Sequence, residues 1–152
     1  MGRRSREAAP DDAGGSAERG APDRDELTAV VAALHFDLAE VLGTDCAPKV
    51  FDRVAAALDE QFTSVVTTGQ TVDREMLLTG VWSARNTQPG LEIAVSDVRE
   101  IARSGNLVIV RFTAENRMAG ALTRRVSTAV LVTDGRTHLW RSVHETSTPA
   151  ES

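Results

Sequence analysis

The sequence lacks tyrosine and has only one cysteine and one lysine among its 152 residues. Without tyrosine there is no phenol of the kind that many acid–base pockets use to stabilise an oxyanion. The lone Cys46 cannot form an intrachain disulfide, so the expected compartment is a reducing cytoplasm. No segment approaches the roughly 18 uninterrupted apolar residues of a membrane span, and we expect no membrane partner.

The composition that remains is that of one globular domain. Hydrophobic residues make up 41% of the chain, which suffices for a core, and the net charge of -5 argues against nucleic acid as a partner. Residues 1–24 are rich in glycine, alanine, proline, arginine and aspartate without periodicity, and they predict a disordered tail. We expect the domain over residues 25–147 and a frayed end over 148–152.

The first half of the domain predicts three helices and one strand. Apolar residues at helical spacing over 27–42 indicate the first helix, and Pro48 suits the first turn of the second. The β-branched run 62–68 predicts a strand. Asp73 is a good N-cap for the third helix, flanked by Val72 and Leu77 as a hydrophobic staple.

The second half predicts four consecutive strands, over residues 91–102, 107–117, 124–133 and 137–146. Helices followed by a run of antiparallel strands indicate an α+β domain with three helices packed on a curved, mainly antiparallel sheet. Such a sheet can form a cone with an internal pocket. Strand alternation places Arg111, Thr113 and Glu115 on one face of the second run. On a covered face these charges must be paired or line a cavity, whereas on a solvated face they are ordinary.

The order of these elements resembles the nuclear transport factor 2-like (cystatin-like) superfamily, in its SnoaL-like, polyketide-cyclase-like branch, from Glu26 to Thr146. The resemblance depends on four segments together: Gly69–Leu78, Val110–Thr113, Ser127–Leu131 and His144–Thr146. The association domain of calcium/calmodulin-dependent kinase belongs to this superfamily and has a similar Arg-x-Thr strand and final strand. Carried over, its pocket residues place Arg111 and Glu145 in the cavity. Similar enzymes use Tyr, Asp and His, and these sets do not map residue by residue.

The candidate chemistry follows from these positions. Glu145 and Asp97 are the candidate catalytic bases, because a carboxylate in an apolar cone can have a raised pKa. A structural alternative is that Arg111 neutralises Glu145 and the pair does no chemistry. The candidate ligand-binding residues are Arg111, Thr113, Glu115, His35 and Trp82.

We expect neither a cofactor nor a metal. His138 and His144 would lie about 20 Å apart on one strand, too far to share an ion. Cys46 precedes a helix but has no histidine partner that the sequence can identify.

Trp140 shares its strand parity with His144 and opposes Glu145. We therefore expect Trp140 and His144 on the outer face of the sheet, where a large apolar group favours a homodimer. The predicted function is small-molecule binding in the cone, with simple acid–base activity of the isomerase, cyclase or dehydratase type as an extension. A non-catalytic oligomerisation or partner-binding module is the alternative.

Overall fold

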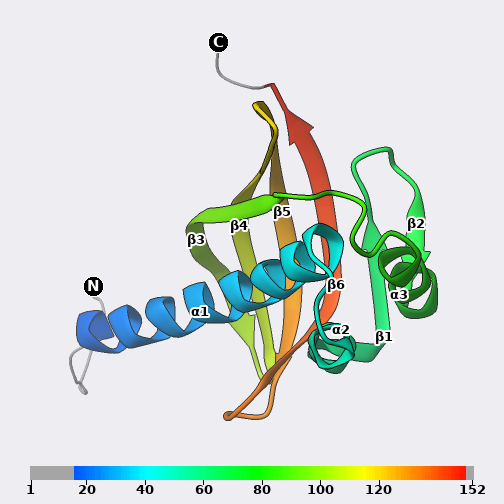
Figure 1. Ribbon diagram of the computed structural model, residues 1–152. Helices are drawn as coiled ribbons and strands as arrows, with labels where there is room; N and C mark the ends of the chain where they lie inside the picture. Colours follow the sequence, from blue (N-terminus) through cyan, green and yellow to red (C-terminus); the bar gives the residue numbers. More distant parts are fainter. Residues whose placement is uncertain (1–15, 150–152) are drawn as a thin grey trace.

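Three helices and a six-stranded sheet make up the computed structural model, which describes residues 16–149 (Figure 1). The α+β class predicted from the sequence is confirmed. The predictions for residues 1–15 and 150–152 lie outside the described residues, and the first helix begins within the predicted tail. The helices are α1 (Ser16–Gly43), α2 (Pro48–Ala57) and α3 (Arg74–Ser83); the strands are β1 (Leu58–Val65), β2 (Thr71–Asp73), β3 (Glu92–Ser104), β4 (Leu107–Met118), β5 (Ala121–Thr133) and β6 (His138–Thr148).

The sheet is open and mixed, with strand order β2-β1-β6-β5-β4-β3. Only the β1–β6 pair is parallel; the other neighbours run antiparallel. Helix α1 crosses one face of this sheet, while α2 and α3 lie beside β1 (Figure 1). We call the face beneath α1 the inner face and the opposite one the outer face.

Strand β4 shows how the sequence separates the two faces. Val108, Val110, Phe112 and Ala114 are buried, and the residues between them are more exposed. The buried set packs in one core with apolar residues of α1 and α2. Because side chains alternate along a strand, this pattern fixes the orientation of β4 and, through its register, of its neighbours.

Short-range signals set the helix ends. The Asp73 carboxylate accepts a hydrogen bond of 2.8 Å from the Met76 backbone N–H and caps α3 as predicted. Pro48 begins α2, where its missing N–H costs no helical bond. Gly43 ends α1 close to the loop before β3, since a Cβ at this position would lie 3.0 Å from the Gln88 carbonyl oxygen. A glycine here lets α1 approach that loop.

Candidate functional site

A β-bulge in β6 determines which of its side chains point inward. Ser142 is paired with Val130, but Trp140 is paired with Leu131, so Arg141 is an extra residue in the ladder. The bulge reverses the alternation between its two sides. Both Trp140 and Glu145 therefore project from the inner face. The prediction that Trp140 lies on the outer face is wrong for this reason, and Trp140 is only 1% exposed.

Arg111 lies on the outer face, opposite in direction to Glu145. It is exposed, lies across from Arg99 of β3, and donates a 3.2 Å hydrogen bond to the Thr128 hydroxyl. His144 is the β6 partner of Thr128 and shares this face. The predicted Arg111–Glu145 pair is therefore wrong, because Arg111 alternates with the buried Val110 and Phe112.

Thr113 and Glu115 accompany Arg111 on the outer face, since they alternate with the buried positions of β4. Their predicted position in the cone is wrong for the same reason. Glu115 accepts hydrogen bonds from Arg124 at 2.8 Å and from Arg117 at 3.0 Å. These bonds, that of Arg124 above that of Arg117, lower the pKa of the Glu115 carboxyl.

Asp97 lies in a β-bulge of β3, between the residues paired with Thr113 and Arg111. Its backbone has φ of 54° and the residue is exposed. Left-handed backbone is uncommon for a residue with a side chain, although aspartate tolerates it better than most. Strands β4 and β5 lie between β3 and β6 in the sheet, so Asp97 is not a neighbour of Glu145.

Four polar residues gather at one end of the inner face, and we call them the inner polar cluster: Asn116, Arg125, Ser127 and Glu145. Arg125 lies 3.3 Å from a Glu145 carboxylate oxygen and donates a 2.8 Å hydrogen bond to the Asn116 side-chain oxygen. The side chains of Arg125 and Glu145 are 16% and 22% exposed. A partly buried ion pair is stable only when its charged groups are also well hydrogen-bonded, and here the bond from Arg125 to Asn116 meets part of that need.

Ser127 is the buried member of the cluster. It is the strand partner of both Phe112 and Glu145 and is 1% exposed. Its hydroxyl is buried without a hydrogen-bond partner among the described residues. An unsatisfied buried hydroxyl is costly, so native sites of this kind commonly hold a water or a ligand group.

His35 of α1 faces the same interior. Its ring lies edge-on to Phe112 and Trp140, with centroids 5.3 and 6.0 Å away, and Nδ1 is 2.8 Å from the Val31 carbonyl oxygen. Burial lowers the pKa of His35 to about 4, and the charge of Arg125 adds to this shift. The ring is therefore neutral at pH 7. Because a carbonyl only accepts, Nδ1 carries the proton and Nε2 is left as an acceptor.

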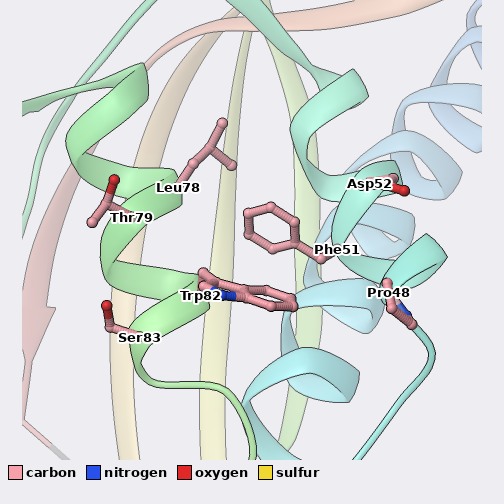
Figure 2. Close-up of a pocket in the computed structure, with 7 residues that line it drawn as sticks. All are labelled: Pro48, Phe51, Asp52, Leu78, Thr79, Trp82 and Ser83. Atoms are coloured by element: carbon pink, nitrogen blue, oxygen red, sulfur yellow. The ribbon is translucent and has the colours of Figure 1, made fainter.

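Trp82 lies away from this cluster, in a hollow of about 370 Å³ between α2 and α3 (Figure 2). We call it the α2–α3 hollow. Its aromatic residues are Phe51 and Trp82, whose rings meet edge to face with centroids 5.0 Å apart. Helix α2 contributes Pro48, Phe51 and Asp52 to the lining, and α3 contributes Leu78, Thr79, Trp82 and Ser83.

Sequence reasoning missed Arg125, Asn116 and Ser127. Arg124 and Arg125 are adjacent, so one must face inward, but the sequence of β5 does not show which. Once the register between β4 and β5 is known, the face of Arg125 follows. Its strand partner Ala114 is buried on the inner face, so Arg125 points to the inner face as well.

No group of three or more His, Cys, Asp or Glu side chains within residues 24–149 is arranged to hold a metal ion. In that same range, no helix is long and apolar enough to cross a membrane.

Comparison with solved structures identifies the fold. No protein-family model and no curated protein matches the chain. A nuclear transport factor 2-like protein of unknown function from Pseudomonas aeruginosa is 24% identical, with 84% of this chain and 98% of that one aligned at a TM-score of 0.73. A candidate scytalone dehydratase from Novosphingobium aromaticivorans is 10% identical, with 88% and 89% aligned at 0.68. The association domain of C. elegans CaMKII is 12% identical, with 85% and 98% aligned at 0.65.

The chain thus has the nuclear transport factor 2-like, cystatin-like fold that the sequence predicted. Identities at this level establish the backbone arrangement, and function has to be argued from the residues of this chain.

Proposed function

We propose that this domain binds a small polar molecule at the inner polar cluster. The observation that carries the proposal is the Ser127 hydroxyl, which is 1% exposed and without a partner among the described residues. It lies beside Glu145 in the ladder and two residues from Arg125 on the same face. A ligand oxygen or nitrogen that bonds this hydroxyl would remove its desolvation cost, and this gives binding a physical reason.

The charges of the cluster indicate the kind of ligand. Glu145 offsets the guanidinium charge of Arg125, and Asn116 occupies a further donor. We therefore expect a ligand of low net charge that carries a carbonyl or hydroxyl.

A more specific proposal is that the domain also converts its ligand by acid–base catalysis of the isomerase, cyclase or dehydratase type. Glu145 is the candidate base, and neutral His35 can accept a hydrogen bond through Nε2. The candidate scytalone dehydratase shows that proteins of this fold have been assigned such chemistry. Asp97 has no part in this form because it lies exposed in its bulge.

A thermal-shift screen of uncharged, polyketide-like aromatic compounds that carry carbonyl or hydroxyl groups tests the binding site. We expect a compound that raises the melting temperature of the wild type and of Thr128→Ala, but not of Ser127→Ala. The two substitutions remove hydroxyls from adjacent residues on opposite faces, so the outer-face variant is a matched control. A screen in which no compound stabilises the wild type, or in which Ser127→Ala responds equally, contradicts the site.

Self-association through the outer face is a second candidate function. Val126, Val130 and Ile109 are partly buried there, and α1 crosses the other face (Figure 1). Arg111 and His144 belong to the same surface, whereas Trp140 does not. We expect a dimer at micromolar concentration in sedimentation experiments, and a monomer for Val130→Asp. Phe36→Asp, at a helix position that is 62% exposed, should remain a dimer. A monomeric wild type contradicts this candidate.

A further inference from the structure

The α2–α3 hollow is a site of different chemistry from the inner polar cluster. Its volume of about 370 Å³ lies within the range of small-molecule sites, roughly 300–1,000 Å³. The rings of Phe51 and Trp82 point toward one another from opposite helices, with Leu78 beside them (Figure 2). Trp82 nevertheless remains 40% exposed, so the aromatic wall is incompletely covered by the protein.

Three polar side chains border this aromatic wall: Asp52, Thr79 and Ser83. Within residues 24–149, none of them has a side-chain hydrogen bond or ion pair. The neighbouring Arg53 does not pair with Asp52, because it donates two hydrogen bonds to Asp37, at 3.0 and 3.2 Å. The polar rim of the hollow is thus free to bond a ligand.

The charge of the rim selects the ligand. Asp52 is the one charged residue among the seven that line the hollow, and the chain as a whole carries -5. The Arg85 guanidinium lies over the Trp82 ring, 4.2 Å from the ring centroid, so one face of this ring already holds a cation, and Asp52 is the lining residue that can attract an ammonium group. A carboxylate beside electron-rich rings favours an organic cation over an anion.

We propose that the α2–α3 hollow binds a small aromatic amine. The ring packs against Phe51, Trp82 and Leu78, and the ammonium group lies at the Asp52 carboxylate. The Thr79 and Ser83 hydroxyls, on the α3 side of the hollow and across from Asp52, bond a hydroxyl on the ring.

Protein NMR with phenethylamine as the probe tests this inference. The chain has two tryptophans, and their indole N–H resonances report on the hollow (Trp82) and on the core (Trp140) separately. We expect phenethylamine to shift the Trp82 resonance with a dissociation constant on the order of 1 mM, as befits a small ligand in an open hollow. The Trp140 resonance should stay in place. Phenylacetate, an anion of matching size, should bind at least about threefold more weakly.

Substitutions test whether Asp52 binds the ammonium group and whether Trp82 binds the aromatic ring of the probe. Asp52→Asn should weaken phenethylamine by about two- to fivefold, because an exposed ion pair contributes modestly. Asp45→Asn, at an exposed site outside the lining, should bind as the wild type does. Trp82→Leu should lose the binding measured on backbone amides of α2 and α3.

Three results would overturn the proposal. The first is an unmoved Trp82 resonance at about 10 mM phenethylamine, well above the expected dissociation constant. The second is equal binding of phenylacetate, or an Asp52→Asn variant that binds as tightly as the wild type. The third is loss of phenethylamine binding in Ser127→Ala, which would assign the ligand to the inner polar cluster instead.

Discussion

Two consecutive arginines, Arg124 and Arg125, illustrate how differently the two faces of the sheet use the same side chain. Arg124 points outward and bonds Glu115, which also holds Arg117. Arg125 points inward, bonds Glu145 and the Asn116 amide, and lies near the neutral ring of His35. Side-chain alternation alone separates the two environments. The outer arginine belongs to a solvated network, whereas the inner one organises a half-buried site.

We expect the largest difference in stability loss between an exposed and a buried position at the two tryptophans. Trp140→Ala removes a ring that is 1% exposed and packed on Phe112 and His35. We expect a loss of about 3–5 kcal/mol in the free energy of unfolding, measured by urea denaturation. Trp82→Ala should cost clearly less, because that ring is 40% exposed. Equal losses would contradict the placement of Trp140 in the core.

The second-largest effect is a pH dependence of the free energy of unfolding, caused by His35. Burial lowers the pKa of the folded residue to about 4 from 6.5, so the unfolded chain binds more protons between these values. Stability should therefore fall as the pH drops from 6.5 to about 4, by about 3 kcal/mol, and this contribution should change no further below that. It is fully present above pH 6.5.

Urea titrations across this pH range measure the His35 effect. His35→Leu should flatten the dependence, while His144→Gln on the outer face should keep the slope of the wild type. A His35→Leu variant with an unchanged slope would assign the pH dependence to other groups.

The third effect compares the two arginines directly. Arg125→Ala leaves Glu145 half-buried and without its ion-pair partner, and we expect a loss of about 2 kcal/mol in the free energy of unfolding. Arg124→Ala should cost less, because Glu115 keeps Arg117. The comparison fails if the outer substitution is the more damaging of the two in the same chemical denaturation experiment.

The smallest effect is a gain in stability. Asp97 has φ of 54° in an exposed bulge, where glycine pays no steric penalty. Asp97→Gly should raise the free energy of unfolding by about 0.5–1 kcal/mol. It should also leave ligand binding at the inner polar cluster unchanged. Lost binding would return Asp97 to the candidate site.

Periodicity predicted the elements well because each one carries its own signal. The Asp73 cap of α3 and the alternation of β4 are local patterns, and both appear in the structure as expected. These features depend on residues that are neighbours in sequence.

The faces could not be predicted, because they depend on contacts between distant residues. One extra residue, Arg141, reverses the parity of β6, and no local pattern marks it. With the parity reversed, Trp140 joins the core on the same face as Glu145. Glu145 pairs with Arg125 and not with Arg111, because Arg111 alternates with the buried Val110 and Phe112 of β4. The burial of the Ser127 hydroxyl could not be predicted either, because it depends on strand pairing with Phe112 and Glu145, which lie far from Ser127 in the sequence.

The arrangement of the two faces can be tested by cysteine labelling at adjacent positions of β6. In a background of Cys46→Ala with Val130→Asp, which keeps the outer face free of a second copy, His144→Cys and Glu145→Cys each introduce a single thiol, on the outer and inner face respectively. We predict that a maleimide labels the folded His144→Cys variant several-fold faster than the folded Glu145→Cys variant, with equal rates once both are unfolded in urea. Equal rates in the folded state, or faster labelling of Glu145→Cys, would contradict the account.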